Sequence, residues 1–212
     1  MINHLLFRDE LGIERAMSRL VSWQIRKLLL HVASTERRLG DLVRIAVGCE
    51  LAEFREYYRR LALGKEWMGP FGFTGELDTS WEKVLVEHPD LLLVWRDHDG
   101  IAGHAIWHET STDEHREGDP RDSEDKAILR KLCGGKKENI VELHELWLRK
   151  KHRGKGYGKR FFEFFEDLIR RKGYDSIVYY ADHPAAIAIC KNRGWKEGFL
   201  AEHKWHVFCL SL

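Results

Sequence analysis

The sequence lacks several features that would assign a chain to a class at once. None of its apolar runs reaches 18 residues, so we expect no membrane-spanning helix. Neither charge prevails, because 35 Lys and Arg against 34 Asp and Glu give a formal net charge of +1. A general coating of nucleic acid or of a membrane surface is therefore not expected. With no repeat or low-complexity tract, what remains is a globular chain of 212 residues, enough for one domain with an appendage.

Cysteine is scarce and scattered. The four residues, Cys49, Cys133, Cys190 and Cys209, include no CxxC pair and no Cys/His spacing typical of zinc. The first ten residues, "MINHLLFRDE", contain no long apolar run, so we expect no signal peptide. Reduced thiols and a cytoplasmic location are then the expectation.

Two histidines raise the question of a metal. His104 and His108 in "GHAIWHE" would share one face of an expected strand. No third ligand stands at a suitable spacing, so the sequence predicts no metal site.

Hydrophobic periodicity predicts a helical extension followed by a domain of mixed α and β structure. We expect the extension over 1–40, with one long helix at 10–33, and the domain over 41–212, with a charged insertion at 110–138. Helices are expected at 49–63, 80–88, 160–173 and 183–194, and strands at 42–48, 91–97, 101–109, 139–149 and 176–182, followed by two closing strands. This order implies a mixed sheet with helices on both faces.

A basic, glycine-rich run between a strand and a helix carries the strongest chemical signal. The run "RKKHRGKGYGKR" (149–160) has seven Lys and Arg, no acidic residue, and glycine at alternate positions. Glycines let backbone N–H groups come close to an anion, and the positive end of the following helix dipole adds to the same spot. The run therefore predicts a phosphate or pyrophosphate site.

Spacing excludes two familiar phosphate-binding loops. A P-loop fails because Gly154 precedes Gly158 by one residue too few, and a dinucleotide-binding GxGxxG fails because its third glycine comes one residue early. RNA would suit seven cations, but Tyr157 is the only one of Phe, Tyr and Trp in the run, so we do not expect nucleic acid as a partner. The pattern that fits is [Arg/Gln]-x-x-Gly-x-[Gly/Ala], beginning at Arg153.

Together with its neighbours, this loop resembles the GNAT superfamily of acyl-CoA-dependent N-acyltransferases. The stretch from "ELWLRKKHRGKGYGKR" to "AIAICKNRGW" (145–195) is similar to the family's strand, pyrophosphate loop, helix, strand and helix, in that order. The resemblance covers roughly residues 40–212. It implies a mixed α/β (α+β) fold with a mostly antiparallel central sheet, helices on both faces and one splayed strand pair. It also implies an acetyl-CoA-dependent N-acetyltransferase, or alternatively an acyl-CoA-binding module with weak or lost catalysis.

The resemblance implies a set of cofactor-binding residues. The backbone of Leu146, Trp147 and Leu148 would pair with the pantetheine arm of acetyl-CoA. The N–H groups of the loop would hold the pyrophosphate, with added charge from Lys159; these loop residues are Arg153, Gly154, Lys155, Gly156, Tyr157 and Gly158. His183 takes the position of a family asparagine that bonds cofactor amides.

Direct attack by a neutral amine requires a proton acceptor. Glu142 stands eleven residues before Arg153, the spacing at which one branch of the family places a general-base glutamate. His144 shares its strand face, two residues on, and its ordinary pKa of ~6.5 suits the task better than the ~4.3 of a glutamate. Glu145 is expected on the opposite face. The base thus stays open between Glu142, His144 and neither.

Cys190 departs from the family pattern. Many members carry a tyrosine at this position, one helical turn before Gly-Phe, here Gly194-Trp195, and its hydroxyl assists the departing CoA thiolate. A thiol can donate a proton but is shorter by a whole ring. Cys190 is therefore a catalytic acid, a small packing residue, or a redox-active or acylated thiol. Tyr179 and Tyr180 are candidate substitutes for the missing hydroxyl.

The acceptor is the least readable part of the sequence. An amine on a small molecule or a protein is expected, and the stretch 109–125, with eight acidic and two basic residues, would attract a cationic one if it is not merely a solvated loop. Trp67, Phe71 and Phe73 either line an acceptor pocket or pack under their loop. The long helix at 10–33 either covers the sheet or binds a second copy, as in a homodimer.

Overall fold

The computed structural model describes residues 37–38, 44–47, 51–63 and 79–212, which all belong to one compact unit, Arg37–Leu212. The expected helix at 10–33 and the aromatic loop with Trp67, Phe71 and Phe73 lie outside the described residues. Within this described part, no helix combines the length and the apolar character needed to span a bilayer.

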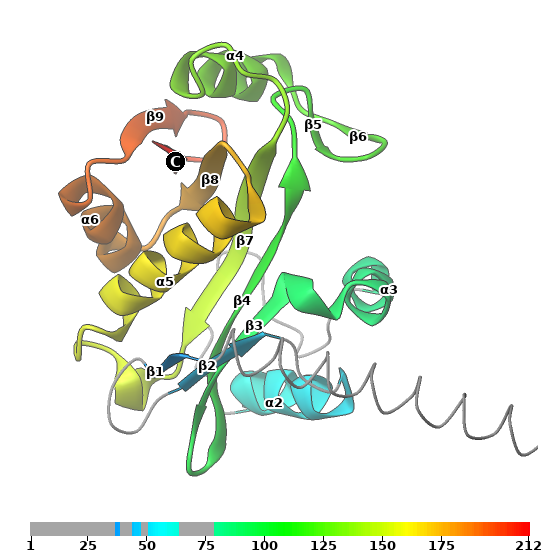
Figure 1. The fold of residues 1–212 in the computed structure, drawn as a ribbon, viewed down its shortest axis with the longest axis vertical. Helices are drawn as coiled ribbons and strands as arrows, with labels where there is room; N and C mark the ends of the chain where they lie inside the picture. The colour runs from blue at the N-terminus through cyan, green and yellow to red at the C-terminus, as the bar shows by residue number, and fades with distance from the viewer. Residues whose placement is uncertain (1–36, 39–43, 48–50, 64–78) are drawn as a thin grey trace, which may run out of the picture. The chain divides into compact units, whose positions relative to one another are not determined.

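One eight-stranded sheet organises the unit (Figure 1). In spatial order its strands are β1 (Arg37–Arg38), β2 (Arg44–Val47), β3 (Leu92–Asp97), β4 (Gly100–Thr110), β7 (Ile140–Leu148), β8 (Ser176–Ala181), β10 (Trp205–Ser211) and β9 (Lys196–Leu200). Only β7 and β8 run parallel, and every other neighbouring pair is antiparallel. The expected mixed, mostly antiparallel sheet is confirmed. The first strand lies inside the segment that the sequence assigned to the helical extension.

Helices cover both faces of the sheet. Along β3, Leu93 and Trp95 belong to the core under α5 (Tyr157–Lys172) and α6 (Pro184–Asn192), whereas Leu92 and Val94 pack with α2 (Leu51–Leu63) and α3 (Thr79–Glu87). This alternation is the period-two pattern of a strand buried on both sides. On the α2 and α3 face, a third cluster packs α4 (Ser123–Leu132) against β8 and β10. The short 3-10 turn η1 (Pro89–Leu91) precedes β3, and a second one, η2 (Lys150–His152), lies at the start of the basic run.

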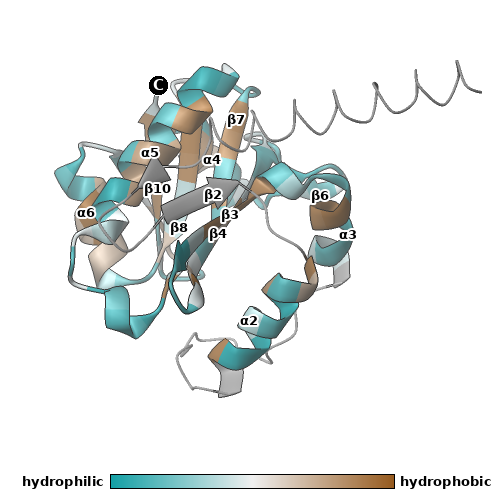
Figure 2. Cartoon of the chain, turned by 60° about the horizontal axis from the view of Figure 1, so that its bottom comes forward, coloured by the Kyte–Doolittle hydropathy of each residue, from teal (hydrophilic) through white to brown (hydrophobic). Residues whose placement is uncertain are grey.

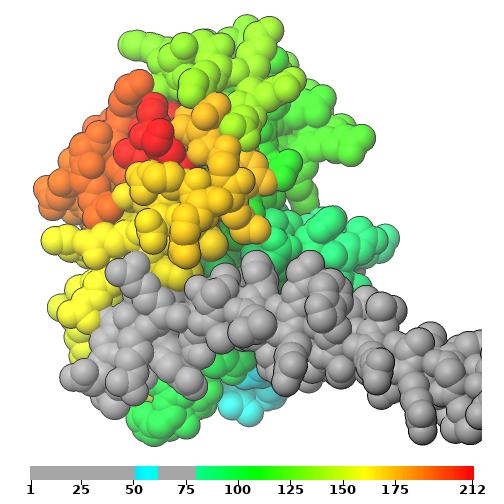
Figure 3. Space-filling view, in the orientation of Figure 1, coloured from blue at the N-terminus to red at the C-terminus, as the bar shows by residue number. Residues whose placement is uncertain are grey.

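Helix α5 links the two parallel strands and forms because its phenylalanines recur at helical spacing. Its apolar side is buried at Phe161, Phe162, Phe164, Phe165 and Leu168. Burying a phenylalanine side chain contributes about 1.5–3 kcal/mol, so this face fixes the helix on the sheet. The brown inner side of α5 is visible in Figure 2, and its outer side forms the yellow surface in Figure 3, beside the orange of α6 and β9. The helix ends at Gly173 as expected.

The charged insertion is more ordered than the sequence suggested. Its first half forms a hairpin of β5 (Glu114–Arg116) and β6 (Asp119–Pro120), and the Asp122 side chain then caps α4 by accepting from the N–H of Asp125 at 2.8 Å. Arg121 and Asp125 are buried. The interpretation of 109–125 as merely a solvated loop is wrong at Arg121 and Asp125, because these charges pair with each other and with Glu142 of the sheet.

Strand β7 contains a β-bulge at His144. Its register against β4 shifts once, since Ile106 lies opposite Glu145 while Trp107 lies opposite Leu143. One extra residue on β7 is therefore left between these two pairs, and it is His144. A bulge of this kind re-aims the side chains that follow it.

The bulge changes which side chains share a face. Leu143 and Leu146, three residues apart, both pack in the core under α5. Glu142 and Glu145 accordingly point to the other face, where Glu142 bonds Arg121 and Glu145 bonds Tyr58 of α2. The expectation that Glu145 faces away from Glu142 was wrong, because strict alternation does not continue through a bulge.

Candidate functional site

The two parallel strands part beyond the bulge. Their paired positions run from Ile140 opposite Ser176 to Leu143 opposite Tyr179, and no later pair joins β7 to β8 in the described residues. Strand β7 continues to Leu148 alongside β4 alone. The second half of β7 thus presents an edge toward β8, which matches the splayed pair that the sequence predicted.

Hydrogen bonding on the β4 side determines which backbone groups lie on that edge. The N–H of Arg149 donates to the carbonyl of Ala102 at 2.9 Å. Residues of an antiparallel strand alternate between bonding to the neighbouring strand and facing away from it. Trp147 therefore pairs with β4, as Arg149 does, while the backbone of Leu146 and Leu148 faces the β8 side.

The basic loop follows directly and ends at the N-terminus of α5. Gly154 and Gly156 have φ of +73° and +78°, a conformation that other residues adopt only with strain. Gly156 is the N-cap of α5 and provides no capping side chain. The first N–H groups of α5 have no partner within the helix, and a helix N-terminus of this kind can bind an anion.

Side chains of the loop divide into anchors and exposed cations. Arg153 donates from Nε to the carbonyl of Leu148 at 2.8 Å and lies over the ring of Trp147, 4.3 Å from its centroid. Arg153 therefore positions the loop against the end of β7. Lys155 and Lys159 are exposed and form no ion pair within the described part of the chain, so they are free to meet an anion.

The preceding turn is tied to the β3–β4 hairpin. Asp97 accepts from His152 Nε2 at 2.7 Å and from Lys151 Nζ at 2.9 Å. Burial acts to raise the pKa of Asp97, but the hydrogen bonds from Lys151 and His152 outweigh it and lower the pKa to about 2. Asp97 therefore remains ionised and fixes the start of the loop.

Helix α6 lies close to the first turn of α5. A Cβ placed on Gly158 would stand 3.1 Å from Cδ1 of Ile189, so the third glycine of the run serves close packing of the two helices. His183 is exposed and caps α6, its Nδ1 accepting from the N–H of Ala185 at 3.2 Å. Because Nδ1 accepts, the proton of the neutral His183 ring lies on Nε2.

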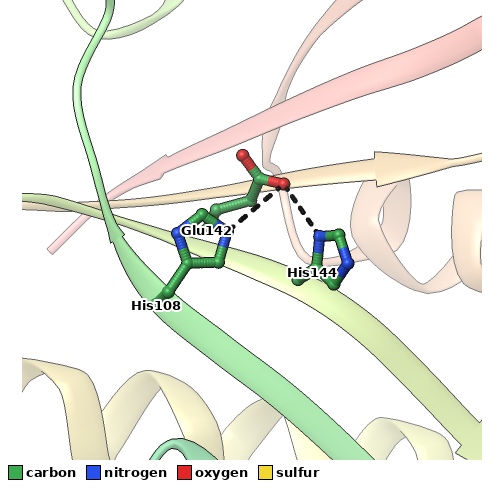
Figure 4. A group of neighbouring side chains, drawn as sticks. All are labelled: His108, Glu142 and His144. Carbon is green, nitrogen blue, oxygen red and sulfur yellow. Dashed lines mark hydrogen bonds and ion pairs between the residues drawn. The ribbon is translucent and has the colours of Figure 1, made fainter. Parts of the chain in front are cut away.

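On the opposite face, a carboxylate and two histidines converge (Figure 4). Oε1 of Glu142 lies 3.7 Å from Nε2 of His108 and 3.5 Å from Nδ1 of His144. Glu142 and His108 are buried, while the His144 side chain is 40% exposed. His144 is thus the member of the group that a solute can reach.

The second oxygen of Glu142 is held by the insertion. Oε2 accepts from Nη2 of Arg121 at 2.9 Å and lies 3.6 Å from Nδ1 of His115. The same guanidinium bonds Asp125 at 2.8 Å and the hydroxyl of Tyr180 at 2.6 Å. The hydrogen bonds of Arg121 thus join α4, β7 and β8 in one buried polar group.

This environment keeps Glu142 ionised. Burial acts to raise the pKa of its carboxyl group, but the neighbouring imidazoles of His108, His115 and His144 outweigh burial and hold the pKa well below its usual value. A carboxylate with such a low pKa is a weak proton acceptor by itself. It is, however, well suited to orient and stabilise a neighbouring imidazolium.

The carboxylate of Glu145 is used in contacts between α2 and the sheet. It accepts from the hydroxyl of Tyr58 at 3.1 Å and pairs with His104 Nε2 at 2.8 Å, and Nδ1 of His104 bonds Tyr57 at 3.2 Å. These bonds fasten α2 to the sheet. The two histidines of "GHAIWHE" therefore belong to two separate pairs, and neither shares a carboxylate with the other.

An aromatic ring covers the two histidines of the Glu142 group. Trp81 of α3 lies 4.7 Å from His144 and 5.5 Å from His108, measured between ring centroids. Arg116 of the β5–β6 hairpin stands 4.8 Å from the centroid of the Trp81 ring. The insertion and α3 thus meet above the group.

Cys190 is a core residue. Its side chain is fully buried in the cluster beneath α5 and α6, and burial raises the pKa of its thiol to about 12. Tyr179 belongs to the same cluster, and burial, followed by the neighbouring Cys190, raises the pKa of its hydroxyl. Tyr180 points to the other face, where its hydroxyl donates to Asp125 at 2.7 Å.

The structure therefore brings some of the predicted residues together and adds others. Glu142 and His144 form one group, while the loop and the edge of β7 form a second one on the β8 side. Sequence reasoning missed Arg121, His108 and Trp81 as members of the first group. The one available signal was the four-residue spacing of His104 and His108, which gave no hint of a carboxylate partner on another strand.

Comparison with known families gives an independent result. The family model described as the Acetyltransferase (GNAT) family matches residues 52–195. Curated protein sequences contain no match to this chain.

Solved structures with this fold span several activities. The GNAT domain of S. lividans PAT has a TM-score of 0.59 at 14% identity, covering 85% of this chain and 98% of its own. A Drosophila melanogaster polyamine N-acetyltransferase has a TM-score of 0.54 at 12% identity, with 80% and 100% covered. The NatC complex bound to Gag peptide and CoA has a TM-score of 0.52 at 16% identity, with 81% and 99% covered. At these identities the likeness shows the fold alone.

Proposed function

The chain belongs to the GNAT acetyltransferase family, and from that premise we propose that it is an acetyl-CoA-dependent N-acetyltransferase. An acceptor amine attacks the thioester carbonyl carbon directly, a C–N bond forms, the C–S bond breaks, and CoA leaves as its thiolate. The observation that carries this proposal is the edge of β7 facing the parted β8, directly before an anion-binding helix N-terminus.

Each part of the cofactor has a proposed contact. The pyrophosphate binds the N–H groups at the start of α5, and Lys155 and Lys159 supply positive charge. The pantetheine amides pair with the backbone of Leu146 and Leu148, which face the β8 side, whereas the Trp147 backbone is engaged by β4. Nε2 of His183 is available to a cofactor amide.

Proton removal falls to His144 together with Glu142. His144 is exposed, and its Nδ1 lies toward the ionised Oε1 of Glu142, so Nε2 is left to receive a proton from the amine directly or through water. The carboxylate then stabilises the imidazolium, as in other carboxylate–histidine pairs. Arg121 holds the other oxygen and is a positioning residue in this scheme.

The thiolate leaves without help from Cys190. A thiol with a pKa of about 12 is a weaker acid than an ordinary thiol of pKa ~8.5, so proton transfer from Cys190 to the CoA thiolate is uphill. Cys190 then serves packing beneath α6. Water is then the proton source, because burial also raises the pKa of the Tyr179 hydroxyl, which belongs to the same cluster.

The acceptor proposed is a cationic amine. Residues 109–125 carry a net charge of −6, to which the buried pair of Arg121 and Asp125 contributes nothing because it is neutral as a pair. Such a surface raises the local concentration of cations. This argument covers a small polyamine and a lysine side chain alike, so it sets the charge class and leaves the individual acceptor to experiment.

An acetyl-CoA titration followed by an amine screen tests the proposal. We expect acetyl-CoA to raise the melting temperature and a panel of cationic amines to release CoA with matched amide formation. Binding without amine-dependent release would favour the alternative of a GNAT-like module with lost catalysis. Absence of any shift at saturating acetyl-CoA would contradict both.

A further inference from the structure

We propose that Glu142, His108 and His144 form a binding site for a divalent transition metal ion, with Zn²⁺ as the matching ion. The ligand atoms are Oε1 of Glu142, Nε2 of His108 and Nδ1 of His144, and all three lie within 4.8 Å of one another. Figure 4 shows both imidazoles turned toward the same carboxylate oxygen.

The distances fit a metal better than they fit hydrogen bonds. The carboxylate oxygen stands 3.7 Å from His108 and 3.5 Å from His144, beyond the usual hydrogen-bond range of about 2.7–3.2 Å. Zinc–nitrogen and zinc–oxygen bonds of about 2.0–2.2 Å at tetrahedral angles separate neighbouring ligand atoms by about 3.3–3.5 Å. Two sides of the triangle are therefore within a few tenths of an ångström of a zinc coordination shell, and rotation of the exposed His144 side chain can shorten the third.

The tautomer of His108 is already the metal-binding one. Its Nδ1 lies 2.8 Å from the carbonyl oxygen of Glu109, and since a carbonyl only accepts, Nδ1 carries the proton. The lone pair of a neutral His108 is then on Nε2, facing the Glu142 oxygen. A hydrogen bond from the second ring nitrogen to a carbonyl is the usual arrangement around metal-ligating histidines.

The net charge of the buried group also favours a bound cation. Glu142 and Asp125 each bring a negative charge, and Arg121 brings one positive charge, so the buried group carries a net negative charge when the histidines are neutral. Burying an uncompensated charge is costly. A bound divalent ion compensates the charge at Oε1, the oxygen that Arg121 leaves open.

The donor set selects the class of metal. Two imidazole nitrogens and one carboxylate oxygen suit zinc and its transition-metal neighbours, whereas calcium and magnesium require mostly oxygen ligands. Three protein ligands leave a fourth position for water or another small ligand. Under the proposed function, the ion would occupy the atoms used for proton transfer and would inhibit the enzyme; that consequence rests on the proposed function, but binding itself does not.

Cobalt substitution tests the site without requiring turnover. The full chain is stripped with a chelator, dialysed and titrated with Co²⁺, whose visible spectrum reports tetrahedral coordination, and Zn²⁺ is added as a competitor. We expect one ion per chain, displaced by Zn²⁺. Affinity should fall by more than about tenfold in His144→Ala and in His108→Ala, since loss of even an outer partner costs about 10–100-fold.

Two control variants separate this site from other donors in the described residues. His203→Ala removes a ligand from the exposed group of Asp122, Glu202 and His203, and Cys133→Ser removes one thiol of the buried pair with Cys209, whose sulfurs are 3.6 Å apart. Both controls should retain the ion. Circular dichroism and an acetyl-CoA thermal shift check that every variant is folded.

Two outcomes would overturn the proposal. One is a wild-type protein that takes up no Co²⁺ in the titration, which would mean that protons alone neutralise the group. The other is an ion that stays bound in both histidine variants or is lost in a control variant. Acetylation by the metal-free protein is measured separately, so failure of the proposed enzyme activity and failure of the metal site are distinguishable.

Discussion

Arg121 donates to Oε2 of Glu142 at 2.9 Å, and both side chains are buried although they lie 21 positions apart in the sequence. The contact makes the charged insertion a structural part of the sheet face that carries His144. It also gives the first half of the insertion (110–125) two separable roles, since its exposed residues are mostly acidic while its buried arginine holds a carboxylate in place.

Replacing Arg121 by Gln should lower the free energy of unfolding at neutral pH by about 3–5 kcal/mol, because it leaves buried carboxylates without their cation. The folded-state pKa of Glu142 is lowered, so its stabilising contribution is present above the ordinary pKa of ~4.3 and is lost as pH falls. The difference between wild type and variant should therefore narrow in acid. Urea unfolding at several pH values measures it.

Arg130→Gln is the matched control for Arg121. Arg130 pairs with Asp113 on the surface, where both side chains are well exposed. Surface pairs of this kind contribute about 0–1 kcal/mol. An equal decrease in the free energy of unfolding in the two variants would show that the buried contacts of Arg121 contribute no more stability than a surface ion pair.

Gly156→Ala tests the cofactor loop. The residue has φ of +78°, so alanine introduces strain of about 1–2 kcal/mol and shifts the N–H groups that follow. Losing one hydrogen bond to a charged group costs about 1.5–3 kcal/mol, which corresponds to about tenfold or more in the Kd of acetyl-CoA. Calorimetric titration measures the affinity.

Gly118→Ala supplies the control for the loop variant. Gly118 has the same φ of +78° and, like Gly156, has no heavy atom within 4 Å of an added Cβ, but it lies in the β5–β6 hairpin. We expect a similar loss of stability with unchanged acetyl-CoA affinity. Equal affinity losses would mean that strain anywhere weakens binding and that the loop is not the site.

Cys190→Ala should keep turnover within about threefold of wild type while lowering stability, because a buried thiol with a raised pKa fills space and donates no proton. Steady-state kinetics and urea unfolding measure the two effects. A loss of about 10²-fold or more in kcat, the size typical of general acid catalysis, would instead make Cys190 the leaving-group acid.

Asp97→Asn should weaken the anchor of the loop in a pH-dependent way. The pKa of Asp97 is lowered to about 2, so its contribution to stability is full above pH ~4 and disappears as pH falls toward 2. Wild type and variant should differ at neutral pH and converge in acid. A difference that is constant across this range would remove the ion pairs with Lys151 and His152 as its cause.

Much of the fold was predictable because local signals agreed with one another. The phenylalanine spacing of α5 and its glycine stop placed the helix, and the alternating glycines before it placed the turn that leads into its N-terminus. The Asp99–Gly100 pair placed the hairpin between β3 and β4. In each case the signal lies within a few residues of the element that it determines.

The sheet face that carries Glu142 and His144 was less predictable because its determinants are distant in sequence. The bulge at His144 arises from the pairing of β7 with β4, and nothing in "VELHELW" predicts it. The bulge is what brings Glu145 to the same face of the sheet as Glu142. Arg121 lies among acidic residues, a context that usually indicates solvated chain, and only the fold brings it to Glu142. The same holds for His108, whose partners stand on another strand.

Transfer of a labelled acetyl group tests the central claim most directly. Acetyl-CoA labelled in the acetyl group is incubated with the protein and a cationic amine, and the label is followed in the amine product and in the intact protein mass. The account predicts one labelled amide for each CoA released and no acetylated protein during turnover. In His144→Gln, amide formation and CoA release should both be lost while acetyl-CoA binding is retained. Label that accumulates on the protein, or that is released only as acetate, would contradict it.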